Sequence, residues 1–232
     1  MTGQVQPTQQ APPVQRLRVR YAKRGRARFT SHRDFARAFE RALRRAGVPM
    51  AYSSGFSPHP RISYANASPT GAASEAEYLE IALAEICDPE KVRAALDAAL
   101  PAGLDIVHVV PASSGALADE LTGSRWRIDL LGIEPQVLAD AVERFLAATS
   151  VLVERMTRTG LREFDARSAV LSLTIEGESL VLVVVHQVPL VRPDDVLTAL
   201  RRLAPALGPV VPISTRLSQG RLDPSTGEIT EP

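Results

Sequence analysis

The chain has 232 residues, of which 45% are hydrophobic and 23% are charged, and its formal net charge is +1. This composition excludes intrinsically disordered and fibrous proteins, and the length allows one large domain or two of about 100 residues each. The only cysteine, Cys87, excludes an internal disulfide framework, an all-cysteine zinc site and an iron–sulfur cluster bound by three cysteines, so we expect no metal, no cofactor and a reducing, cytoplasmic location.

The near-neutral total hides an uneven distribution of charge. The segment from Arg16 to Arg61 contains 13 of the 27 Lys and Arg residues but only two of the 26 Asp and Glu residues. Thirteen positive charges minus two negative charges give this segment +11, so the other residues sum to −10. Clustered guanidinium groups indicate a phosphate-bearing partner, because phosphates that are neutralised by a protein release condensed counterions.

Residues 1–15 are rich in Gln, Pro and Thr and contain no apolar run, which predicts a disordered tail rather than a secretory signal or a membrane helix. Leu17, Val19 and Tyr21 then alternate with two arginines. This two-residue period predicts a strand with one apolar face and one cationic face.

A helix is predicted after Ser31, which can act as its N-cap. Phe35 and Phe39 fall on one side of this helix, and Gly47 and Pro49 end it. Further strands are expected at 50–52, 62–65, 77–83 and 104–110, with a second helix at 90–100. Together these elements form a basic N-terminal domain over residues 16–112.

The same order of elements occurs again after a small, turn-rich linker at 113–123. Strands are expected at 125–131, 151–157, 169–175, 179–186 and 210–217, with helices at 135–148 and 193–203. The order predicts an α+β protein with two tandem ferredoxin-like (βαββαβ) units and antiparallel sheets, the second at 124–220, followed by a tail at 221–232. A single larger α+β domain is the alternative.

Arginines on the first strand, the following turn and the first helix form the main candidate site for RNA or another phosphate. They are Arg18, Arg20, Arg26, Arg28, Arg33, Arg37 and Arg41. Two alternatives need no nucleic acid. In the first, the arginines only face solvent, and Glu40 partly neutralises them by pairing with Arg44 at helical spacing. In the second, the acidic remainder of the chain packs on them.

The run from Gly55 to Arg61 is the most unusual in the chain, because two prolines fix its backbone. A rigid loop that carries Phe56, Ser57, His59 and Arg61 loses little entropy on binding, and we include these four residues in the candidate RNA or phosphate site. In the alternative interpretation the loop only connects two strands and Phe56 fills the core.

Histidines offer a possible route to catalysis. His32 is expected in the first turn of the arginine-bearing helix, and together with His59 it could act as acid and base in a metal-free cleavage of RNA. A solvated helix cap is the simpler role for His32, which we also include in the RNA-binding set. His108 and His186 alternate with apolar residues and are expected to be structural.

In the second unit, Asp165 and Arg167 follow a strand and are candidates for orienting a phosphate or for forming a surface ion pair. The chain contains no Walker loop, dinucleotide glycine fingerprint, HExxH or nucleophile elbow. The commonest enzyme classes that rely on these motifs are therefore excluded.

Four runs resemble a radical-SAM-associated bacterial family of unknown function: 29–34, 41–49, 52–60 and 74–80, with Phe-Asp-Ala-Arg at 164–167 as a looser match. In that family the domain stands alone or follows a cobalamin-binding radical SAM module. The resemblance implies a bacterial cytoplasmic protein with a possible radical SAM partner that acts on RNA. The chain lacks the cysteine triad of the radical SAM module and therefore resembles the stand-alone form.

The predicted layout is also similar to that of the CRISPR RNA-processing endoribonucleases, although their glycine-rich C-terminal loop is absent. Our first expectation is a non-catalytic accessory protein that binds tRNA or rRNA and assists a radical SAM or other RNA-modification system. A metal-free endoribonuclease that uses His32 and His59 is one alternative. A protein-interaction adaptor that docks an acidic partner is the other.

Overall fold

The computed structural model describes residues 9–157, 160–209 and 211–232, and these residues fold into two compact units. The first unit comprises the described residues up to Thr70 together with Ala76–Leu117. The second comprises Gly71–Glu75 together with Ala118–Pro232. Within the described residues, no helix is both long enough and apolar enough to cross a membrane.

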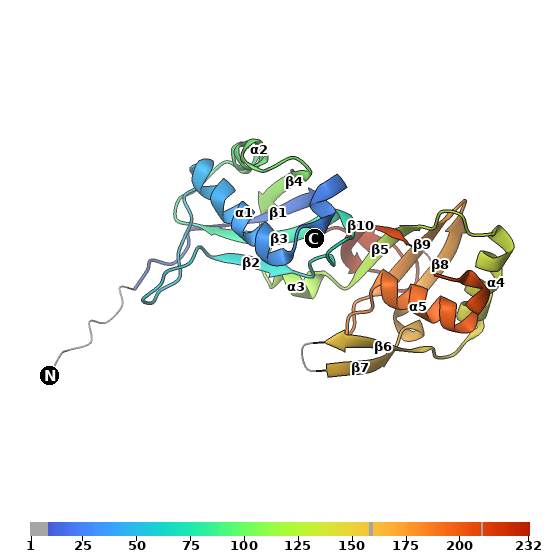
Figure 1. Ribbon diagram of the computed structural model, residues 1–232. Helices are drawn as coiled ribbons and strands as arrows, with labels where there is room; N and C mark the ends of the chain where they lie inside the picture. Colours follow the sequence, from blue (N-terminus) through green and yellow to red (C-terminus); the bar gives the residue numbers. More distant parts are fainter. Residues whose placement is uncertain (1–8, 158–159, 210) are drawn as a thin grey trace. The chain divides into compact units, whose positions relative to one another are not determined.

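The first unit has helices packed on a sheet (Figure 1). Its elements are β1 (Gln15–Lys23), the 3-10 turn η1 (Gly25–Phe29), α1 (His32–Arg45), β2 (Ile62–Ala65), β3 (Ala73–Leu83), α2 (Pro89–Ala99) and β4 (Leu104–Pro111). In the sheet β1 lies between β4 and β3, and β2 pairs with β3. The β1–β4 and β2–β3 pairs are antiparallel.

Strand alternation determines which side chains enter the first core. Leu17 and Val19 of β1 and Leu79 and Ile81 of β3 are fully buried in one cluster with the apolar sides of both helices. In α1 this side includes Phe35, whose ring stacks on Tyr21 at 4.2 Å between centroids. Residues between these positions, such as Arg18 and Glu80, therefore point to the opposite sheet face.

The second unit contains a sheet with the strand order β10-β5-β9-β8, in which all three neighbouring pairs are antiparallel. Its elements are α3 (Leu117–Glu120, whose first residue belongs to the first unit), β5 (Gly123–Asp129), α4 (Pro135–Ala147), β6 (Leu152–Thr157), β7 (Gly160–Asp165), the 3-10 turn η2 (Arg167–Ala169), β8 (Val170–Glu176), β9 (Ser179–Val185), α5 (Pro193–Leu203), the 3-10 turn η3 (Pro205–Leu207), β10 (Ile213–Leu222) and β11 (Ile229–Thr230). The strands β6 and β7 pair only with each other, and β11 pairs with β10.

The α+β class and the mostly antiparallel pairing agree with the prediction. One pair differs, because Ala73 and Ser74 at the start of β3 pair in parallel with Thr215 and Arg216 of β10. The strand expected at 50–52 is reduced to isolated bridges at Met50 and Tyr52. The strand β7 was not predicted, since its exposed residues lack a clear alternation.

Candidate nucleic-acid interface

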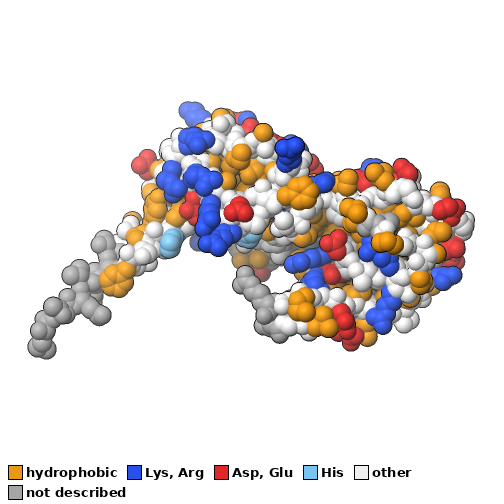
Figure 2. All heavy atoms as spheres, viewed as in Figure 1, with side chains coloured by type: hydrophobic (Ala, Val, Ile, Leu, Met, Phe, Trp, Pro, Cys, Tyr) orange, Lys and Arg blue, Asp and Glu red, His pale blue; other side chains and the backbone are white. Residues whose placement is uncertain are grey.

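The exposed side of α1 carries a row of arginines, which we call the α1 arginine face: Arg33, Arg37, Arg41 and Arg44. Helical spacing aligns these residues opposite the buried phenylalanines. Figure 2 shows Lys and Arg side chains gathered over this helix. Within the described part of the chain none of the four forms an ion pair, and this includes the Glu40–Arg44 pair of the solvated-face alternative.

Arg18 does not belong to this surface, although the strand pattern predicted a solvent-facing side chain. It is only 3% exposed, and its Nε and Nη2 donate to Oε1 of Glu80 at 3.2 and 2.9 Å. Nη2 also donates to the Ser113 hydroxyl. Because a carboxylate and a hydroxyl already bind this guanidinium inside the unit, Arg18 has a structural role and is removed from the candidate RNA-binding set.

The remaining arginines of the N-terminal segment differ in their access to solvent. Arg20 is half-buried on β1, next to exposed His108 of β4 in the pairing register. Arg26 is exposed on η1, and the half-buried guanidinium of Arg28 lies over the Phe29 ring, 4.7 Å from its centroid. Arg26 is therefore more accessible to a partner than Arg28.

The loop at 53–60, which we call the proline loop, is tied at its base. Ser53 donates its backbone N–H to the His59 carbonyl at 2.8 Å, and His59 donates its own N–H to the Ser53 hydroxyl at 3.0 Å. Phe56 is 81% exposed, so the alternative in which it fills the core is wrong. Ser57 and His59 are exposed as well, which leaves an aromatic ring, a hydroxyl and an imidazole on one closed loop.

His32 is the first residue of α1, and its ring meets the edge of Tyr64 from β2 at 4.8 Å between centroids. Ser31, not His32, caps the helix, by accepting the Asp34 N–H. Burial, reinforced by the nearby Glu40 carboxylate, raises the pKa of the Tyr64 hydroxyl. No hydrogen bond or ring contact joins His32 to His59 among the described residues.

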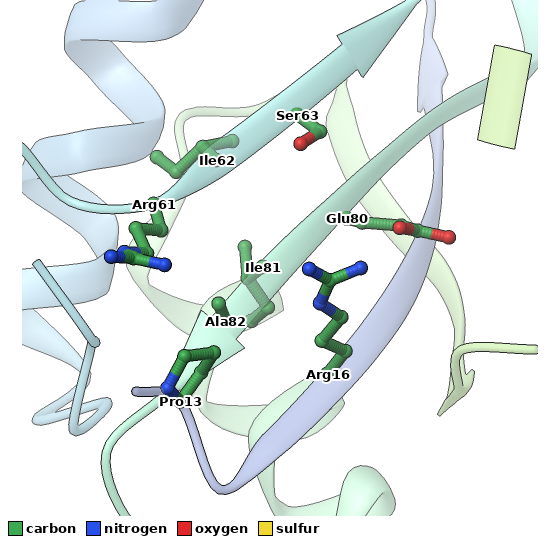
Figure 3. Close-up of a pocket in the computed structure, with 8 residues that line it drawn as sticks. All are labelled: Pro13, Arg16, Arg61, Ile62, Ser63, Glu80, Ile81 and Ala82. Carbon is green, nitrogen blue, oxygen red and sulfur yellow. The ribbon is translucent and has the colours of Figure 1, made fainter. Parts of the chain in front are cut away.

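A pocket of about 350 Å³ opens between β1, β2 and β3 in the first unit. Figure 3 shows the Arg16 guanidinium directed into it, with Arg61 on one side and Glu80 on the other. Ser63 pairs with Glu80 across β2 and β3, and its side chain lies on the same sheet face. Arg16 was not among the predicted binding residues, although its position two residues before Arg18 places it on that face.

The candidate residues of the second unit have structural roles. Asp165 Oδ1 accepts the backbone N–H groups of Val151 and Arg167, both at 2.9 Å. The Arg167 guanidinium donates to the carbonyl oxygens of Val170 and Leu146. The expected Asp165–Arg167 side-chain ion pair does not form in the described residues, because each side chain already holds the backbone around η2.

His186 is also structural, as expected. One ring nitrogen, Nδ1, lies 2.6 Å from the Leu121 carbonyl and the other, Nε2, lies 3.0 Å from the Ser124 hydroxyl, which also accepts the Trp126 indole N–H. Burial lowers the pKa of His186 to about 4, and the positive charge of Arg216 acts in the same direction. In the described part of the chain no cluster of His, Cys, Asp and Glu side chains is suited to hold a metal ion.

Residues 16–193 match the profile of a family described as an uncharacterized protein conserved in bacteria, DUF2344. The chain belongs to this family. The match confirms the prediction, made from the four sequence runs, that the chain belongs to an uncharacterized bacterial family. The matched region of this DUF2344 protein includes the α1 arginine face, the proline loop and every residue that lines the pocket except Pro13, and it ends at the start of α5.

No curated protein matches the chain. Among solved structures, the crystal structure of an unknown protein from Galdieria sulphuraria is similar to this DUF2344 protein at 16% identity, with a TM-score of 0.26. The match covers 87% of this chain and 98% of the other.

Proposed function

We propose that this protein is a cytoplasmic RNA-binding accessory protein that binds through the α1 arginine face and the proline loop. The observation that carries the proposal is the absence of ion pairs at Arg33, Arg37 and Arg41 within the described residues. Aligned cations on one helix repel one another, so an anionic partner stabilises them. A phosphate backbone supplies regularly spaced anions, and guanidinium groups bind phosphate oxygens in a two-pronged geometry.

We further interpret the two units as ferredoxin-like. The strand order β4-β1-β3-β2 in the first and β10-β5-β9-β8 in the second, each with two helices, supports this interpretation. The β6–β7 hairpin is then an insertion before the second strand of the second unit, and the parallel start of β3 is an addition to the edge strand β10.

The proposed RNA is tRNA or rRNA, and the proposed system is an RNA-modification pathway with a radical SAM protein as a possible partner. Support for the partner comes only from the sequence resemblance. No observation favours the endoribonuclease alternative: the ring of His32 packs on Tyr64, and no hydrogen bond or ring contact joins it to His59 among the described residues. An adaptor that docks an acidic protein would use the same cations, and the following experiment separates it from an RNA-binding protein.

The affinity for RNA is expected to fall steeply with salt. Fluorescence anisotropy with labelled bacterial tRNA and with fragmented rRNA, each titrated from low to high KCl, gives the slope of log affinity against log salt. Arg33→Ala and Arg37→Ala should each flatten this slope by about 0.7 to 0.9, which corresponds to the loss of one phosphate contact.

The matched control is Arg93→Ala, because Arg93 on α2 already pairs with Glu90 at 2.7 Å. Its salt slope should equal that of the parent. An RNA affinity that does not depend on salt, or slopes unchanged in both α1 variants, would contradict the proposal. Retention of an acidic protein after nuclease treatment, with no RNA affinity, would favour the adaptor.

Phe56→Ala is expected to weaken binding to single-stranded RNA without unfolding the protein. The ring is too exposed to contribute to the core, so the melting temperature should not change. Stacking of a base on an aromatic ring contributes about 1–3 kcal/mol, so the affinity for an unstructured oligoribonucleotide should fall by about 5- to 150-fold. Phe56→Tyr retains an aromatic face and serves as the control. Equal affinities for Phe56→Ala and the parent would remove Phe56 from the interface.

A further inference from the structure

The pocket between β1, β2 and β3 combines positive and negative side chains on the face of the sheet opposite the helices. Arg16 and Arg61 supply the positive charge, and Glu80 supplies a carboxylate on the far side of the Arg16 guanidinium (Figure 3). Its volume, about 350 Å³, falls at the lower end of the usual range for small-molecule sites. This arrangement suits a ligand with both an anionic group and hydrogen-bond donors.

The two arginines are suited to hold the anionic group. Arg61 donates its Nε to the Tyr52 carbonyl at 3.1 Å, which orients the guanidinium while its terminal amino groups keep their hydrogen-bonding capacity. Arg16 makes no side-chain hydrogen bond or ion pair with any described residue. Arg16 on β1 and Arg61 directly before β2 line the same pocket, and two guanidinium groups can together bind several oxygens of one phosphate.

Glu80 is suited to accept hydroxyl protons. Nε and Nη2 of Arg18 both donate to Oε1 of Glu80, which fixes the carboxylate in place. Its other oxygen, Oε2, has no hydrogen-bond partner among the described residues and can accept from a ligand. An ionised carboxylate can only accept hydrogen bonds and repels a phosphate. The phosphate therefore sits toward Arg61, and a donor such as a sugar hydroxyl sits toward Glu80, with Ser63 as its cross-strand neighbour.

We propose that this pocket binds a ribonucleoside phosphate, with the phosphate between Arg16 and Arg61 and a ribose hydroxyl donating to Glu80. The ligand is either a free nucleotide or the terminal nucleotide of an RNA. This proposal goes beyond the binding of RNA to the α1 arginine face. The pocket would recognise one phosphate together with its sugar, whereas the α1 arginine face would bind a series of backbone phosphates.

Isothermal titration of the full chain tests the site with AMP, 2′,3′-dideoxy-AMP, adenosine and inorganic phosphate. AMP should bind, and each of the other three should bind about tenfold or more weakly, because each lacks one of the two interactions. Arg16→Ala should weaken AMP binding about 10- to 100-fold. Because Arg16 is exposed, this variant should keep the parent melting temperature. Arg93→Ala is the control and should bind AMP as the parent does.

Short oligoribonucleotides with a 5′-phosphate or a 5′-hydroxyl separate the two sources. Preference for AMP identifies a free nucleotide, and preference for the 5′-phosphorylated oligoribonucleotide identifies an RNA end. Inorganic phosphate binding as tightly as AMP, an unchanged affinity in Arg16→Ala, or no binding of either nucleotide probe at millimolar concentration would overturn the proposal. The salt titration of the α1 variants uses different side chains, so each proposal can fail while the other stands.

Discussion

Glu80→Gln is expected to destabilise the protein by about 3–5 kcal/mol, because it removes the charge that compensates a buried guanidinium. The side chains of Arg18 and Glu80 are 3% and 8% exposed, and their closest atoms lie 2.9 Å apart. The nearly buried guanidinium would keep its charge without the Glu80 carboxylate beside it. Urea denaturation followed by circular dichroism should therefore show a lower midpoint with an unchanged slope.

Two further variants test whether the loss of the carboxylate charge, rather than the substitution of a side chain as such, destabilises the protein. Replacing both partners, as in Arg18→Met with Glu80→Leu, removes the buried charges together and should restore most of the lost stability. Glu90→Gln breaks the exposed pair with Arg93 and should leave the urea midpoint unchanged. Parent-like stability of Glu80→Gln would show that the Arg18 guanidinium does not depend on this carboxylate.

Stability is expected to decrease as the pH falls from about 6.5 to about 4, because His186 is held neutral in the folded protein. Its pKa is lowered from 6.5 to about 4 by burial and by the positive charge of Arg216. Between these values the unfolded chain binds a proton that the folded protein excludes, so acidification favours unfolding. The full contribution is about 3 kcal/mol, present as stability above pH 6.5 and lost by pH 4.

Urea unfolding at a series of pH values, compared between the parent and His186→Gln, measures this contribution. The difference between the two proteins should shrink as the pH falls through this window, since the glutamine does not titrate. The raised pKa of Asp195, which burial causes, affects both proteins alike and cancels. A constant difference between parent and His186→Gln would contradict the assignment.

The amino-acid pattern predicted those parts of the protein that depend on local periodicity. The helix with Arg33 and Arg37 outside and Phe35 and Phe39 inside follows from the 3.6-residue repeat, and Ser31 caps it as expected. The strand at Ile62–Ala65 and the helix at Pro193–Leu203 have the predicted bounds. In these segments the tertiary neighbours reinforce the local preference.

The incorrect predictions concern features that depend on residues far away in the sequence. Alternation in β1 correctly separates Arg18 from the core residues, but it cannot show that Glu80, 62 residues later in the sequence, buries the guanidinium. The same limit applies to Asp165, whose carboxylate binds backbone N–H groups rather than Arg167. The pocket joins residues of three strands, and only the register of β2 with β3 places Ser63 beside Glu80.

Ultraviolet crosslinking of the full chain to total bacterial tRNA and fragmented rRNA, followed by mass spectrometry of the crosslinked peptides, tests the RNA interface most directly. The crosslinked peptides are predicted to come from the segment between Arg26 and Arg61, with Phe56 and His59 as the main attachment sites. Crosslinks confined to the second unit would contradict binding through the α1 arginine face and the proline loop. A crosslinking yield no higher than that of the triple variant Arg33→Ala, Arg37→Ala, Arg41→Ala would contradict it as well.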